Sequence, residues 1–513
     1  MTVEEAVARI WCDVLGVQRV APDADLLDLG GDEVTAGWIA GRIRRAFPAC
    51  TVTGRDVMVD APTVSSLAAL VDASRPPLEI SSQQEALLAR SRIARVRGIP
   101  MRPFTVGAAV EIIGRLDVEA LRVSLAQIVA RHAPLRTSYC LDGAWRVVLN
   151  EDVPAFALPV VDLLALPAAR RDAAVTAALV EAANTVFHPD DPVRLRAQLL
   201  RTGDDRYVLG LVLDHLVADG SSIDVLYAEL SAGYAANRGT EPVNHAFFEF
   251  VAEQRRWSVS PECAAEITFW RDTLGPDGVH GDMPLPFERA VDAGAATVAH
   301  TIGARLPPET VARLDAAARQ TRSTRFRVVL AALSVVLNRV TGRDTVTISS
   351  PDANRSHPGA ADAIGWYAHV VLYRCDLSGD PDLDQVMNRV RHTFTQAQAH
   401  KHLPYRDLTR ALSPDTFGLP RTATWVSLVA VDTPVLELTG LRCRPRNIPA
   451  DAPNRALEVE LEDHHDGAVE LRINFDAYRF DESAVADLFD RILLVVGRLA
   501  EDRSIRLSAL PSG

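Results

Sequence analysis

The sequence predicts two unlike units: a small bundle made only of α-helices, followed by a larger region of α/β type with strands and helices in α+β layers. Three observations predict this organisation. The chain has 513 residues, which is too many for a single hydrophobic core. Apolar residues in roughly the first 75 positions recur at helical spacing. From about residue 80, short apolar runs typical of strands alternate with helical patterns.

The first unit covers residues 1–75 and shows three helical segments. One apolar stripe predicts a helix over 3–15, and a second predicts a helix over about 33–47. Thr63 or Ser65 can cap a last helix that runs through Val71. Pro76 and Pro77 then interrupt the pattern, which predicts a linker over 76–80.

The larger region carries strand and helix patterns throughout its length. Strands are expected at 106–114, 145–150, 195–202, 207–215, 298–304, 345–349, 370–375, 423–431 and 469–478. Helices are expected at 118–131, 169–184, 308–321, 325–341, 383–399 and 482–501. The alternation of the two patterns favours sheets that are covered by helices.

Composition excludes several classes of function. The formal net charge of −13 argues against nucleic acid and against anionic membranes, which both attract basic surfaces. No apolar run approaches the roughly 20 residues that span a bilayer. The first helix is amphipathic and acidic, unlike a signal peptide, so we expect a cytoplasmic protein. The six cysteines form no CxxC pair and indicate free thiols, and no cluster at ligand spacing predicts a metal site.

The segment at 211–222, LVLDHLVADGSS, carries the chemistry. An apolar strand runs into His215, a short turn follows with Asp219 and Gly220, and a helical pattern begins at Ser222. This order places an imidazole where a buried strand opens to a cleft. A base in such a position suffices for an acyl transfer that needs no covalent enzyme intermediate.

The segment resembles the HHxxxDG motif of the condensation domains of nonribosomal peptide synthetases, with Asp214 in place of the first histidine. Other family motifs follow in family order along residues 80–513. They are SSQQEALL at 81–88, RHAPLRTSY at 131–139, FFEFVAEQRRW at 247–257, the helix, strand and NR loop of 326–355, IGWYAH at 364–369 and HLPYRDL at 402–408. The resemblance implies two lobes of the chloramphenicol acetyltransferase fold, over 81–245 and 246–513, which form a V around a channel.

The resemblance also implies roles for these residues. His215 accepts or holds the proton of the attacking amine, and the amide of Gly220 is a possible donor to the oxyanion. Asp219 forms a structural pair with Arg355, and Ser222 supports the site. Because successive strand residues face opposite sides, Asp214 is expected to face away from the channel as a bystander that meets the core or another side chain. The implied partners are acyl- or peptidyl-loaded carrier proteins, an amine acceptor that is carrier-bound or free, and other synthetase modules in trans.

The first unit resembles a peptidyl carrier protein, which implies a four-helix bundle. Residues 24–36, ADLLDLGGDEVTA, match the family signature DxFFxLGGxSxxA except at its serine, where Glu33 stands. That serine receives 4′-phosphopantetheine, and a carboxylate cannot form the same phosphodiester. We therefore expect 4′-phosphopantetheine only on partner carriers. A negative charge at a helix start is favourable, so the fold should be kept.

Two alternative functions stay open. Asp214, Asp219 and Ser222 also satisfy DxxxxDxxS, the signature of heterocyclization domains, although the family's later PVVFTS-like strand and LDHQ-like turn are absent. A non-catalytic docking domain that recruits trans-acting enzymes is the second alternative, because both Glu33 and Asp214 depart from catalytic patterns. A relationship to epimerization domains has less support, because the sequence contains no distinct glutamate motif.

Overall fold

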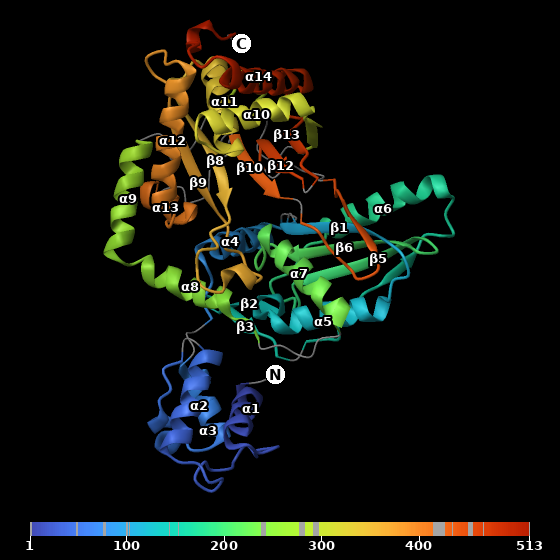
Figure 1. The fold of residues 1–513 in the computed structure, drawn as a ribbon, viewed down its shortest axis with the longest axis vertical. Coiled ribbons are helices and arrows are strands. Elements are labelled where there is room, and N and C mark those ends of the chain that lie inside the picture. The colour runs from blue at the N-terminus through green and yellow to red at the C-terminus, as the bar shows by residue number, and fades with distance from the viewer. Residues whose placement is uncertain are drawn as a thin grey trace.

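The computed structural model describes residues 3–47, 50–74, 78–98, 101, 103–142, 144–151, 153–236, 243–275, 283–290, 297–413, 426–432, 434–449, 455–464 and 466–511. The helical N-terminal unit lies at one end of the molecule, the first lobe in the middle and the second lobe at the other end (Figure 1). Part of the predicted linker over 76–80 lies outside the described residues. In the described part of the chain, no helix has the length and apolar character needed to cross a membrane.

The N-terminal unit is a helical bundle, as predicted. Its helices are α1 (Val3–Leu15), α2 (Glu33–Ala46) and α3 (Val64–Ser74), and the fourth helical element is a short π-helical turn at Asp56–Asp60. Trp11, Ile39 and Leu67 are fully buried in its core. Asp32 caps α2 in a reciprocal capping box with Thr35, which satisfies donors at the helix start without using position 33.

The first lobe is built on a five-stranded sheet of order β11-β1-β6-β5-β4. Its strands are β1 (Thr105–Ile113), β4 (Val160–Asp162), β5 (Leu195–Gly203), β6 (Arg206–Asp214) and β11 (Arg442–Arg446). Helices α5 (Val118–Arg131) and α7 (Ser221–Ala236) pack on one face, and α6 (Ala168–Ala183) packs on the other. A hairpin of β2 (Thr137–Asp142) and β3 (Ala144–Leu149) lies beside this sheet.

The second lobe has a six-stranded sheet of order β7-β13-β12-β10-β8-β9. Its strands are β7 (Ala299–Arg305), β8 (Thr345–Asp352), β9 (His369–Asp376), β10 (Val426–Asp432), β12 (Leu457–Asp463) and β13 (Val469–Asp476). Helices α10 (Pro308–Gln320), α11 (Arg325–Thr341), α12 (Leu383–Ala399) and α14 (Glu482–Glu501) share one core with it. Successive residues of a strand face opposite sides. Leu428 and Val459 therefore face these helices, while Val429 and Glu460 line a cavity between the lobes.

Several described elements link the two lobes. Helices α8 (Ala246–Trp257) and α9 (Pro261–Leu274) carry the chain from the first lobe to the second. Helix α4 (Ser82–Arg97) contacts α13 (Tyr405–Leu412). Strand β11 lies in the sequence range assigned to the second lobe, 246–513, yet it pairs antiparallel with β1 of the first sheet. The two lobes are therefore not divided by a single boundary in the sequence between residues 245 and 246.

Candidate active site

His215 directly follows the last residue of β6, between the lobes. Its backbone N–H donates to the carbonyl of Phe104 (3.1 Å). Its half-buried ring stacks on Phe104, with centroids 4.2 Å apart, and lies 4.6 Å from the ring of Trp366 in the second lobe. Nδ1 has no hydrogen-bond partner among the described residues.

The environment of His215 favours its neutral form. Burial lowers the pKa of the imidazole below its ordinary value, and the smaller effects of nearby backbone groups and of the Asp219 carboxylate act in the opposite direction. A neutral imidazole can accept a proton at neutral pH. His215 is therefore chemically suited to act as a base or as a hydrogen-bond acceptor.

Asp219 is buried, and both of its carboxylate oxygens are occupied. Oδ1 accepts from Arg355 Nη2 (2.6 Å), from Ser222 Oγ (2.9 Å) and from the Ser222 N–H (3.1 Å). Oδ2 accepts from the N–H groups of Tyr367 and Ala368, each at 3.0 Å. These contacts tie the Asp219 turn to the start of α7 and to the second lobe.

Arg355 joins the Asp219 turn to the second lobe. Its Nη1 donates to the carbonyls of Ala360 (2.6 Å) and Ala363 (2.5 Å), and its guanidinium carbon lies 4.7 Å from the centroid of the Tyr367 ring. The side chains of Arg355 and Asp219 are 12% and 2% exposed. Ser222 Oγ adds a second link, because it accepts from the N–H of Gly365 (3.3 Å).

The start of α7 borders two cavities. One, of about 520 Å³, is lined by α5, α7 and Arg355. The other, of about 910 Å³, lies between the first sheet, α7 and the strands β10 and β12 of the second lobe. Ser221 and Asp224 line both cavities, and Gly220 lines the larger one. A Cβ at position 220 would meet no atom within 4 Å, so Gly220 borders open space. Two cavities therefore meet at the start of α7.

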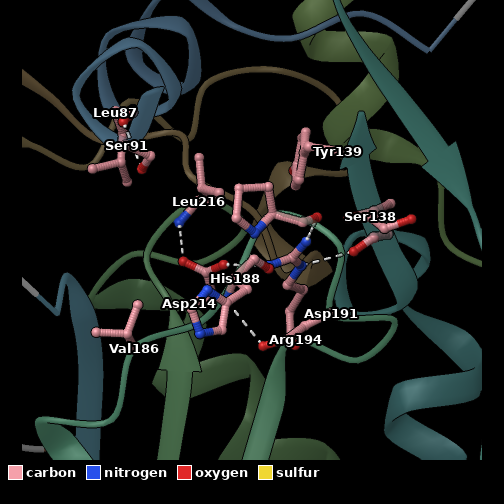
Figure 2. Close-up of polar contacts among 12 residues, drawn as sticks. Leu87, Ser91, Ser138, Tyr139, Val186, His188, Asp191, Arg194, Asp214 and Leu216 are labelled. Atoms are coloured by element: carbon pink, nitrogen blue, oxygen red, sulfur yellow. Dashed lines mark hydrogen bonds and ion pairs between the residues drawn. The ribbon is translucent and has the colours of Figure 1, made fainter. Parts of the chain in front are cut away.

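Asp214 points away from the cleft into the first lobe, where it meets Arg194, a residue that the sequence analysis missed. Arg194 Nη1 donates to Asp214 Oδ2 (3.0 Å), and the two side chains are 0% and 5% exposed (Figure 2). Burial raises the pKa of Asp214 to about 6, although Arg194 lowers it. One signal in the sequence could have indicated such a partner. A carboxylate at the end of an apolar strand is expected to be buried, and a buried carboxylate requires a cation nearby.

The remaining candidate site residue, Glu33, lies in the N-terminal bundle and away from this cleft. Glu33 is the exposed first residue of α2. Among the described residues, one group has ligand atoms close enough for a metal ion, namely Glu462, His464 and Glu470. Arg472 forms ion pairs with both glutamates of that group. The proximity of these side chains is therefore explained by a network of ion pairs.

Comparisons with known proteins agree with this architecture. Residues 102–511 match the family model described as "Condensation domain", and residues 5–71 match the one described as "Phosphopantetheine attachment site". Over 99% of its length the chain is 28% identical to a probable non-canonical nonribosomal peptide synthetase, CymA, of Salinispora arenicola. It spans 7% of that relative's length, and 6% to 21% of the length of other curated relatives such as a linear gramicidin synthase subunit and an isonitrile lipopeptide synthase.

Two solved structures share the fold of the larger region. The X-domain in its complex with OxyB from teicoplanin biosynthesis superposes with a TM-score of 0.73 at 25% identity, over 85% of this chain and 96% of that one. The first condensation domain of the calcium-dependent antibiotic synthetase, in complex with a substrate analogue, gives a TM-score of 0.69 at 18% identity, over 85% and 100%. The predicted two-lobed fold is confirmed.

Proposed function

This chain belongs to the condensation-domain family of nonribosomal peptide synthetases, preceded by a carrier-type domain, and we propose that it forms an amide between a carrier-bound acyl thioester and an amine acceptor. One observation supports this most strongly. A half-buried imidazole with a lowered pKa, His215, lies in the turn that leads into α7, and the start of α7 borders two cavities.

The proposed reaction uses few groups of the protein. The amine nitrogen attacks the thioester carbonyl, and His215 accepts the proton that the nitrogen loses. The Gly220 amide is the candidate donor to the oxyanion. The C–N bond forms, the C–S bond breaks, and the thiolate of the donor arm leaves and takes up a proton. A positioned base contributes about 10²–10⁴-fold, and alignment of the two substrates contributes at least as much.

We also propose that the carriers act in trans. Residue 33 offers no hydroxyl for 4′-phosphopantetheine, so the attachment position does not fit that group. The geometry supports the same conclusion, because α2 borders the first lobe with its last residues, Arg45 and Ala46, which line a cavity together with Arg131 and His245. Position 33 lies at the opposite end of this helix, about 20 Å away by helical rise.

A docking function is the second candidate, and a specific observation favours it. The X-domain of teicoplanin biosynthesis, which is 25% identical to this chain, was solved in complex with OxyB. Asp214 also departs from the family's double histidine. This chain, however, keeps His215 and keeps the Asp219–Arg355 pair. These features favour catalysis over docking alone.

Reconstitution with separate loaded carriers tests these functions against one another. A donor thioester on one carrier and an amine on another should give a linear amide, detected by intact mass. Heterocyclization instead predicts a product lighter by one water from a cysteine, serine or threonine acceptor, lost when Asp214 is changed to Ala. A docking domain predicts no product with any donor, together with measurable binding to an enzyme that acts on carriers.

A further inference from the structure

The turn that carries His215 is held by its backbone on both sides. The Asp214 N–H donates to the carbonyl of Arg194 (3.0 Å), and the Leu216 N–H donates to Asp214 Oδ1 (3.0 Å). The Val217 N–H closes the turn onto the Asp214 carbonyl (3.0 Å). The backbone flanking His215 is therefore fixed by groups outside the cleft.

Arg194 is the centre of this arrangement. Its Nε donates to the carbonyl of Thr137 (2.7 Å), and its Nη1 donates to the carbonyl of His188 (2.7 Å) and to Asp214. Nη2 donates to the carbonyl of Pro189, and the guanidinium lies 5.1 Å from the centroid of the Tyr139 ring. Each nitrogen of the planar fork is used, so a lysine could reproduce only part of the contacts.

Gln84 holds the other side of the turn. Its side chain is fully buried, and Nε2 donates to the carbonyl of Leu216 (2.7 Å) and to the hydroxyl of Tyr139 (2.9 Å). Tyr139 stands under the guanidinium of Arg194, so Gln84 and Arg194 meet on the same ring. Three distant segments of the chain thus converge on the residues on either side of His215.

We propose that Arg194, acting with Asp214 and Gln84, is the positioning device for His215. None of these three side chains faces the substrate cavities described above. They fix the two residues that flank the imidazole, while Phe104 and Trp366 confine its ring. Loss of the device lets the turn relax, and misplacement of a catalytic group by about 1 Å costs on the order of 10²-fold in rate. This proposal rests on the proposed function of His215.

The chain offers conservative variants for the test. Arg194→Lys keeps the charge and loses most of the contacts, and Gln84→Met keeps the volume and loses both donated bonds. Arg196→Lys is the matched control. Arg196 lies two residues after Arg194, within β5, where it pairs with Asp191 and stacks on Phe187. Its side chain interacts with no residue of the His215 turn among the described residues. Thermal melting identifies the variants that stay folded.

Two readouts separate positioning from general stability. The first is the titration of His215, followed by NMR on protein with ¹³C-labelled histidine rings and assigned among the 13 histidines with His215→Gln. The second is kcat for amide formation on separate carriers. We expect folded Gln84→Met and Arg194→Lys to shift the His215 titration towards that of free histidine and to lower kcat at least tenfold at unchanged KM. Arg196→Lys should change neither.

An unchanged titration in both folded variants overturns the positioning proposal, as does an equal change in Arg196→Lys. The NMR readout needs no turnover. A wild-type chain that forms no amide while its His215 titration still moves in Gln84→Met contradicts the proposed function and supports the positioning device. A wild-type chain that forms amide at the same rate as the folded variants contradicts only the positioning device.

Discussion

At the scale of single residues, the titratable side chains near the turn have different roles because their surroundings differ. Asp214 is paired with a buried arginine, both carboxylate oxygens of Asp219 accept hydrogen bonds, and Nδ1 of His215 has no partner in the described part of the chain. The motif predicted His215, Asp219 and Arg355 as candidates. It could not predict Arg194, because the antiparallel register of β5 and β6, with Leu195 opposite Leu213, is what brings Arg194 next to Asp214.

The lowered pKa of His215 predicts the acid limb of the pH–rate profile. Neutral imidazole is the active form, so activity falls as pH drops through the pKa of the ring. Burial lowers that pKa from 6.5, so the midpoint of the limb in kcat/KM should lie below 6.5. A limb with a midpoint near 7 or above would show that another group controls the acid side.

The Asp219–Arg355 pair predicts a loss of stability. Removing one partner of a buried pair leaves an uncompensated charge and costs about 3–5 kcal/mol, so Arg355→Ala and Asp219→Ala should each lower the thermal midpoint by several degrees. Arg491, whose partner Asp487 is 60% exposed, is the matched control, and Arg491→Ala should leave the midpoint nearly unchanged. Unaltered midpoints in both buried-pair variants would refute this account of the turn.

At the scale of elements, periodicity located most of the long helices and most of the central strands, because each of them buries one face, but it did not locate the helices α4 and α9 or the central strand β12. Periodicity also missed β11, because its sequence, RCRPR, shows no alternation of apolar and polar residues. The strand forms only by pairing with the edge of the sheet in the first lobe. Pro445 fits an edge strand, where a missing N–H is tolerated. The π-helical turn of the bundle is likewise too short for a periodic signal.

The start of α2 predicts how the carrier domain responds to one change. Wild-type protein, incubated with a broad-specificity phosphopantetheinyl transferase and coenzyme A, should gain no mass. Glu33→Ser should gain one phosphopantetheine, because Asp32 and Thr35 supply the cap and position 33 is exposed. Glu33→Ala is the control and should stay unloaded. An adduct on the wild-type chain would disprove the prediction.

At the scale of the whole molecule, the site exists only where the lobes meet. The first lobe supplies His215 and Gly220, the second supplies Arg355 and Trp366, and each of the two cavities is lined by residues of both lobes. The resemblance of separate motifs predicted two lobes around a channel. The two cavities and the pairing of β11 with the sheet of the first lobe could not be predicted, because they depend on contacts between segments that are distant in the sequence.

The rate of linear amide formation in single turnover, with donor and acceptor on separate carriers, tests the central claim most directly. His215→Ala should slow this step by about 10²–10⁴-fold. His392→Ala removes an exposed histidine on α12 and should match the wild type. A folded His215→Ala protein that forms the same amide at the wild-type rate would contradict the account.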